Sequence, residues 1–157
     1  MNSPSERERA LHLLQRIERE NLYASLLLIG ESGFVRTLVL GVLRWRSRLD
    51  FFIGVLAKRS INQLDASVVE VLRLGLYQLL YMDVAPYAAV DETVSLTPKR
   101  ARGFVNAVLR GATRVKLAEP QDLATRTAHP PWLIERWTRM YGAERTARIA
   151  VSGRQNA

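Results

Sequence analysis

The chain has 157 residues, with 23 Lys+Arg against 15 Asp+Glu, a formal charge of +8, 48% hydrophobic residues and no cysteine. A chain of about 150 residues buries roughly 70% of its unfolded surface, so one domain with its own core is expected. The lack of cysteine excludes disulfides, thiolate zinc sites and cysteine nucleophiles, and two histidines are too few for an all-histidine site. We therefore expect no metal site in this chain.

The N-terminus and the apolar runs predict a soluble, cytoplasmic protein with no membrane partner. Residues 1–9 mix two glutamates with two arginines before any apolar run, which is not the basic-then-apolar order of a secretory signal. The longest apolar stretch, residues 22–29, is much shorter than the ~20 residues that a membrane-spanning helix needs.

Apolar residues recur at helical spacing along the whole chain, which predicts an all-α fold. Ser5 and Glu8 form a capping-box pattern at the first helix, and Gly142 follows a helix in the usual C-terminal position. The expected helices cover residues 6–19, 35–49, 51–58, 68–82, 86–97, 104–113, 132–141 and 143–151. The predicted organisation is a helical domain over residues 1–115, a polar linker over 116–128 and a helical connector over 129–157.

The segment 68–82 is apolar on nearly every side and is expected at the centre of a helical bundle. Arg73 lies within it, and a largely buried guanidinium must be paired. We favour an ion pair with Glu70, or with an acid on another helix, over contact with RNA. Asp91 and Glu92 are adjacent and so about 100° apart on a helix, which predicts one helix–helix partner rather than a facing acid/base pair.

The positive charge is concentrated in two windows without any acid. Residues 32–49 and 93–118 together hold ten bases, whereas the rest of the chain has 13 bases against 15 acids. Such windows are typical of surfaces that bind nucleic acid or anionic lipid. Arginine accounts for 20 of the 23 bases and binds phosphate bidentately, which favours nucleic acid, although a GC-rich genome would also enrich arginine.

The best candidate for a binding face is one edge of the helix near residues 104–113. Arg102, Asn106, Arg110 and Arg114 recur there at four-residue steps. Cations near a helix C-terminus also complement the helix dipole, which could account for Arg110 and Arg114. In the other window, Trp45 lies on the apolar stripe and is predicted to pack in the core rather than to stack on bases.

The sequence contains no catalytic constellation. Gly30 and Gly33 are not followed by Lys-Ser or Lys-Thr, so they do not form a phosphate-binding loop, and two histidines support no Ser-His-Asp grouping. We therefore predict that this chain is not an enzyme by itself.

Five ordered motifs resemble NusB-like helical RNA-binding domains. They are Leu-Val-Leu-Gly-Val-Leu-Arg at 38–44, Leu-Asp at 49–50, Leu-Arg-Leu-Gly-Leu-Tyr-Gln-Leu-Leu at 72–80, Pro-Tyr-Ala-Ala-Val-Asp-Glu-Thr-Val at 86–94 and Gly-Phe-Val-Asn-Ala-Val-Leu-Arg at 103–110. The version that is most similar is the N-terminal domain of the RsmB (Fmu/Sun) family of bacterial ribosomal RNA cytosine-5 methyltransferases. The run His-Pro-Pro-Trp-Leu at 129–133 is similar to the connector toward the catalytic region of that family. The segment 95–102 departs from the family in being short and containing Pro98.

The resemblance implies a NusB-like bundle, followed by a short C-terminal helical extension, that docks 16S ribosomal RNA for a SAM-dependent methyltransferase domain. S-adenosylmethionine belongs to that absent domain, so no cofactor is expected here. The basic windows and the resemblance together predict phosphate contacts at Arg7, Arg44, Arg48, Lys99, Arg100, Arg102, Arg110 and Arg114. Structural or interface roles are predicted for Arg73, Glu92, Asn106, Trp132 and Trp137.

Two other functions remain open on the sequence. The chain could act as a NusB-type transcription antitermination factor, or as a protein-interaction module that binds a ribosomal protein. Trp132 and Trp137 on a terminal helix suit a protein interface. The partner at that interface is expected to be the chain's own methyltransferase domain, and in its absence a homodimer.

Overall fold

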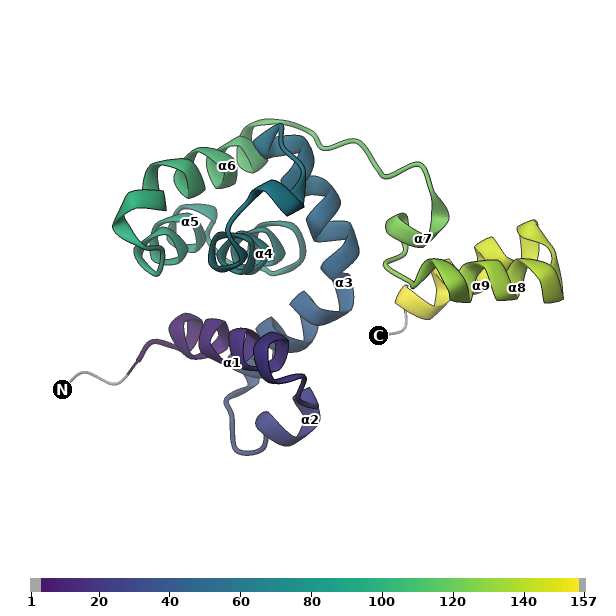
Figure 1. Ribbon diagram of the computed structural model, residues 1–157, viewed down its shortest axis with the longest axis horizontal. Helices are drawn as coiled ribbons and strands as arrows, with labels where there is room; N and C mark the ends of the chain where they lie inside the picture. The colour runs from purple at the N-terminus through teal and green to yellow at the C-terminus, as the bar shows by residue number, and fades with distance from the viewer. Residues whose placement is uncertain (1–3, 156–157) are drawn as a thin grey trace.

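The computed structural model describes residues 4–155, and all regular structure in that range is helical (Figure 1), which confirms the all-α prediction. The helices are α1 (Glu6–Glu20), α2 (Ala24–Leu27), α3 (Gly33–Ala57), α4 (Ala66–Tyr81), α5 (Pro86–Ser95), α6 (Arg102–Arg114), α7 (Leu123–Arg126), α8 (Pro131–Tyr141) and α9 (Ala143–Gln155). Two short 3-10 turns, η1 (Ile61–Gln63) and η2 (Lys99–Ala101), precede α4 and α6.

The helix ends follow the capping signals in the sequence. The Ser5 hydroxyl accepts a hydrogen bond from the Glu8 backbone N–H at 3.1 Å and begins α1, and Asn21 ends it with a left-handed φ of 51°. Pro86 occupies the first turn of α5, where its missing N–H has no intrahelical partner to lose.

Two segments show more than the expected helix ranges. α3 is one helix of 25 residues, in which the short helix expected over residues 51–58 continues from the preceding one, because neither glycine nor proline interrupts the chain between Leu49 and Phe52. The predicted linker contains the helix α7, which Asp122 caps by accepting hydrogen bonds from the backbone N–H and the hydroxyl of Thr125 at 2.9 and 2.8 Å.

α4 lies at the centre of a bundle formed by α1 and α3 to α6 (Figure 1). Every residue from Val68 to Gln78 is buried, including the polar side chains of Glu70, Arg73 and Gln78. The buried apolar residues of α4 join those of α1, α3, α5 and α6 in one core. A helix surrounded on all sides in this way must find a partner for each of its polar groups.

Arg73 is paired with acids on two helices. Its guanidinium donates to both carboxylate oxygens of Asp50 on α3 at 2.7 and 2.9 Å, and to Glu70 on α4 at 3.2 Å. Burial raises the pKa of Glu70 above its ordinary value, and the charge of Arg73 opposes that rise. Arg73 therefore ties α3 to α4, and this ion pair is the interpretation favoured from the sequence.

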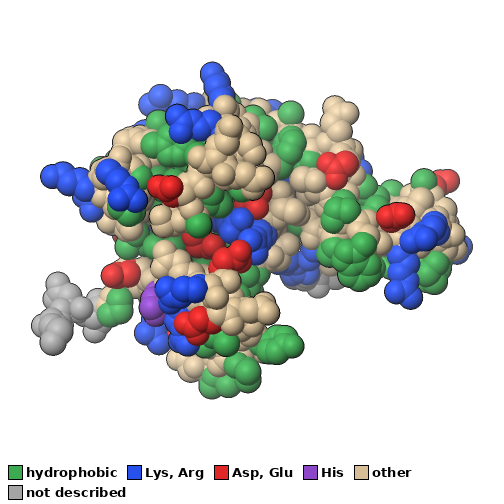
Figure 2. All heavy atoms as spheres, viewed as in Figure 1, with side chains coloured by type: hydrophobic (Ala, Val, Ile, Leu, Met, Phe, Trp, Pro, Cys, Tyr) green, Lys and Arg blue, Asp and Glu red, His purple; other side chains and the backbone are tan. Residues whose placement is uncertain are grey.

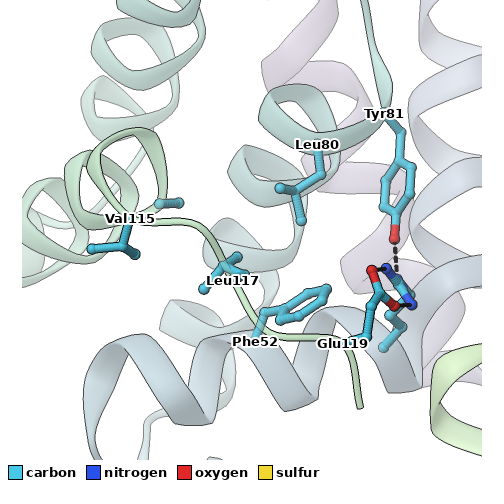
Figure 3. A pocket seen from close by; sticks show the side chains of 8 residues that line it. Phe52, Leu80, Tyr81, Val115, Leu117 and Glu119 are labelled. Atoms are coloured by element: carbon cyan, nitrogen blue, oxygen red, sulfur yellow. Dashed lines mark hydrogen bonds and ion pairs between the residues drawn. The ribbon is translucent and has the colours of Figure 1, made fainter.

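The C-terminal helices α7 to α9 lie beside the bundle and are joined to it by the extended segment after α6 (Figure 1). That segment is held against the bundle. Figure 3 shows Leu117 beside Phe52, and Glu119 and Tyr81 pointing toward one another, at the edge of a pocket. The volume of this pocket is about 250 Å³. Leu117 packs against the core.

Arg48 on α3 supplies the polar half of this attachment. Its guanidinium donates to the Tyr81 hydroxyl at 2.6 Å, to the carboxylate of Glu119 at 2.5 and 2.6 Å, and to the Arg126 carbonyl at 2.9 Å. These bonds join α3 and α4 to Glu119 before α7 and to Arg126, the last residue of α7, so Arg48 attaches the segment at two points.

Within residues 4–155, no helix has the length and apolarity to cross a membrane.

A close contact between α3 and α4 generates a prediction. A Cβ atom on Gly41 would lie 1.9 Å from the Tyr77 ring, and the ring is buried, so it cannot move away freely. We expect Gly41→Ala to lower the free energy of unfolding by about 1–3 kcal/mol through overpacking. Gly103 is a matched control, because a Cβ there meets no atom within 4 Å and Gly103→Ala should be neutral or stabilising by up to about 1 kcal/mol. Chemical denaturation of both variants measures the difference, and equal stabilities would contradict it.

A second prediction concerns the attachment by Arg48. The hydrogen bond from Arg48 lowers the pKa of Glu119. The pair therefore stabilises the fold fully above the unfolded-state pKa of about 4.3. This stabilisation is lost as the pH falls through the lower pKa of the folded state. Because Glu119 is largely exposed, we expect Glu119→Gln to cost only about 0.2–1 kcal/mol at neutral pH, and less in acid.

Denaturation of the wild type and of Glu119→Gln across this pH range measures that difference, and limited proteolysis should show faster cleavage within residues 115–122 in the variant. Glu144→Gln is the control, since Glu144 pairs with Arg148 within α9 and does not touch the segment. A stability difference that persists unchanged in acid would contradict the prediction.

Candidate nucleic-acid interface

α6 separates an apolar face from a basic one. Val105, Val108 and Leu109 are buried in the bundle. Gly75 on α4 allows the close approach, because a Cβ there would lie 2.7 Å from both methyl carbons of Leu109. Burial of this face leaves Arg110 and Arg114 directed to solvent.

The basic residues around α6 form one exposed surface, which we call the α6 surface. It consists of Arg59, Lys99, Arg100, Arg102, Arg110, Arg114 and Lys116. Figure 2 shows Lys and Arg side chains gathered over this part of the molecule. Most of the surface belongs to the second acid-free window of the sequence.

Few of these cations are neutralised. Within residues 4–155, no carboxylate lies within 4.0 Å of the charged groups of Lys99, Arg110, Arg114 or Lys116, and Arg100 makes only an exposed pair with Asp65 at 3.8 Å. Cations this exposed are available to an anionic partner, because binding it costs little desolvation of the protein.

Two residues of the predicted stripe also have local roles. Arg102 donates to the carbonyls of Thr97 at 2.9 Å and Ser95 at 3.3 Å, so it caps the C-terminal end of α5. Arg110 donates through Nε to the Asn106 side-chain oxygen at 3.0 Å, and this bond orients its remaining donors along the helix edge.

Arg59 was missed by sequence reasoning. It follows α3 and lies outside both basic windows, but its guanidinium sits 5.5 Å from the centre of the Phe104 ring on α6. The C-terminal end of α3 packs against α6, since a Cβ atom on Gly111 of α6 would lie 3.5 Å from the Leu56 side chain of α3. No spacing signal in the sequence indicates this neighbour, because it is brought in by helix packing.

Two of the four arginines in the first basic window are neutralised in space, which changes the prediction for those two residues. Arg46 makes two hydrogen bonds of 2.8 Å to Glu18 on α1, and Arg48 is held by Glu119. The hydrogen bond from Arg46 lowers the pKa of Glu18. Burial of the carboxyl group acts in the opposite direction but is the smaller effect. The acids that balance these arginines come from distant parts of the chain.

Arg7 and Arg48 are engaged inside the molecule, contrary to the prediction that both contact phosphate. Arg7 on α1 pairs with Glu92 on α5, donates to Gln78 on α4 and stacks over the Phe34 ring at 5.2 Å, with its side chain only 15% exposed. Arg48 is similarly covered, with 14% of its side chain exposed. Both arginines use their donors to hold helices together. Glu92 accordingly serves as a helix–helix partner.

The tryptophans differ in their surroundings. Trp45 is partly buried and stacks on Tyr81 with ring centres 5.0 Å apart, which places it in packing rather than on an open platform. Trp137 is half-buried and meets the His129 ring edge-on at 5.5 Å. Trp132 is 62% exposed, and Met140 and Tyr141 on the same helix are also exposed. α8 thus carries uncovered apolar side chains.

The chain's motifs and helices agree with a known family. A NusB family model matches residues 4–114, which is the whole bundle from α1 to the end of α6. The chain belongs to the NusB family. The resemblance stated from the sequence motifs is therefore confirmed.

The NusB domain matches the N-terminal part of curated ribosomal RNA small subunit methyltransferases B. It is 38% identical over 111 residues to that of Pseudomonas putida, covering 66% of this chain and 26% of the relative. It is 35% identical over 118 residues to that of Escherichia coli O1:K1 / APEC, covering 71% and 28%. The chain as a whole is 31% identical over 171 aligned residues to the probable ribosomal RNA small subunit methyltransferase B of Bacillus subtilis, covering 95% of this chain and 38% of the relative. The chain thus spans about a quarter to two fifths of these relatives.

Proposed function

We propose that this NusB domain binds ribosomal RNA through the α6 surface and presents it to a methyltransferase domain that modifies a cytosine of 16S RNA. The observation that carries the proposal is the cluster of exposed, unneutralised cations around α6. The membership of the NusB family and the names of the relatives support RNA as the anionic partner.

The chemistry of the cations suits an RNA backbone. Five of the seven members of the α6 surface are arginines, whose planar forks bind phosphate bidentately and stack on bases. Such contacts to phosphate position a nucleic acid without reading its sequence. The NusB domain would therefore supply affinity and orientation. In this proposal the catalytic residues and S-adenosylmethionine belong to the methyltransferase domain, and the present chain carries out no methyl transfer.

Charge reversal on α6 tests the proposal. We expect the double variant Arg110→Glu, Arg114→Glu to weaken binding of a 16S ribosomal RNA fragment at least tenfold. The slope of log affinity against log salt should also fall by about 0.7 for each lost phosphate contact. Fluorescence anisotropy at several salt concentrations measures both quantities.

Arg145→Glu is the matched control, because Arg145 is an exposed arginine on α9, away from the α6 surface. Arg102 is unsuitable as the test residue, since it also caps α5. Salt-independent affinity, or equal binding by the α6 double variant and the control, would exclude the α6 surface as the RNA site.

The exposed apolar side of α8 favours a second, protein-binding role for the C-terminal helices. We propose that Trp132 and Met140 contact the methyltransferase domain, because the relatives are much longer than this chain and their names denote that activity. A homodimer through the same side chains is the alternative.

Sedimentation velocity of the wild type and of Trp132→Arg distinguishes the two interfaces. A concentration-dependent dimer that the substitution abolishes would assign this face of α8 to a second copy of the chain. A wild type that stays monomeric while Trp132→Arg lowers affinity for the separately produced methyltransferase domain would assign it to that domain.

A further inference from the structure

A groove of about 280 Å³ separates the middle of α3 from the turn that leads into α8. Leu43, Arg44 and Ser47 line one side of it, and His129 and Pro130 line the other. The groove lies at the joint between the NusB bundle and the C-terminal helices, on residues that are not part of the α6 surface. Its walls come from two segments, residues 43–50 and 128–131, that are far apart in the chain.

The acids near this groove are already engaged. Asp50, which also lines it, accepts two hydrogen bonds from Arg73. Glu18 pairs with Arg46, whose side chain borders the groove. No carboxylate among residues 4–155 forms an ion pair with Arg44, and its Nε atom is buried without a hydrogen-bond partner. A buried guanidinium N–H without an acceptor is costly, so Arg44 has hydrogen-bonding capacity that no group of the described chain satisfies.

Two further basic groups lie near Arg44: His129 lines the same groove, and Arg154 on α9 lines the neighbouring pocket with Trp45 and Thr127. Arg154 on α9 donates to the carbonyls of Thr127 and Ala128, so its guanidinium is fixed at the joint, 5.5 Å from the Trp45 ring. His129 is oriented by a 2.9 Å contact between its Nδ1 and the Thr127 hydroxyl. The backbone of residues 127–129 thus holds both groups in place beside α3.

The electrostatics of the three groups agree with their geometry. Burial, and then the positive charges of Arg154 and Arg44, lower the pKa of His129. Burial and the charge of Arg44 also lower the pKa of Arg154. The charges of Arg44 and Arg154 thus repel one another and favour the neutral His129 ring, and an anion at Arg44 would relieve the repulsion and favour the protonated ring.

We propose that this groove binds a phosphate group, with Arg44 as its principal ligand and Arg154 and His129 beside it. Phosphate fits the chemistry because it accepts several hydrogen bonds at once and carries the charge that the groove lacks. The phosphate could belong to an RNA backbone, in which case the site extends the proposed function and rests on it, or it could be free in solution. Both sources share the same recognition chemistry.

Thermal unfolding of the full chain in sodium phosphate and in sodium chloride at equal ionic strength tests the site. At about ten times the dissociation constant, phosphate should raise the Tm of the wild type by about 3–6 °C. Arg44→Gln should lose this rise. It should also not lower the Tm in chloride, because it removes a repulsive charge. Arg36→Gln is the matched control, since Arg36 is an exposed arginine on the same helix outside the groove, and it should keep the full rise.

A wild type without any phosphate-specific rise would overturn the site, and so would an Arg44→Gln variant with an undiminished rise. Binding of the same variants to a 16S ribosomal RNA fragment then identifies the source. A loss of about tenfold in Arg44→Gln, with Arg36→Gln unchanged, assigns the phosphate to RNA, whereas unchanged RNA binding assigns the site to free phosphate. The phosphate-induced rise in Tm does not involve the α6 double variant, so a failure of RNA docking at α6 leaves this result independent.

Discussion

The burial of α4 from Val68 to Gln78 is the constraint on which the rest of the structure depends. The polar side chains in this stretch have almost no access to water, so they must find partners within the protein. Arg73 takes Asp50 from α3, and Gln78 donates to Thr93 on α5 at 3.1 Å while accepting from Arg7 on α1. The polar groups of the central helix thereby fix the positions of the helices around it, in addition to the apolar contacts of the core.

The arginines of this protein fall into two groups that the bundle separates. Several arginines of α1, α3 and α4 are paired with acids and hold elements together, as Arg46 does with Glu18 and Arg48 with Glu119. Those around α6 are left at the surface with few acids nearby. Much of the net charge of +8 is therefore exposed, and the α6 surface carries a cluster of it. The proposed RNA-binding role would use this cluster and leave the paired arginines to hold the bundle together.

The joint between the bundle and the C-terminal helices is built mainly from guanidinium groups. Arg48 attaches the 115–128 segment from the bundle side, and Arg154 attaches it from α9 by donating to backbone carbonyls. These bonds are directional, so they set the orientation of α8 relative to the NusB domain. If α8 contacts a methyltransferase domain, the same bonds would set the distance between bound RNA and the catalytic residues. The groove at Arg44 lies at this joint, where an RNA strand could contact both parts.

The sequence by itself determined the helices and their type, because capping residues and apolar periodicity act over a few residues. Ser5, Asn21, Pro86 and Gly142 mark helix ends that the structure contains, and the apolar run around Arg73 predicted a central helix that needs an ion pair. The ordered motifs also identified the NusB family, which the match over residues 4–114 confirms. The basic stripe of α6 was visible for the same local reason, since four-residue steps place side chains on one helix edge.

Only the tertiary structure decided which cations remain available. A window without acids along the chain is not a region without acids in space: Glu18 and Glu119 reach Arg46 and Arg48 from 28 and 71 positions away. Packing likewise turned Arg7 inward toward Glu92, brought Arg59 to Phe104, and placed His129 across a groove from Arg44. The physical reason is that charge compensation depends on distance through space, which helix packing sets and which local sequence spacing does not encode.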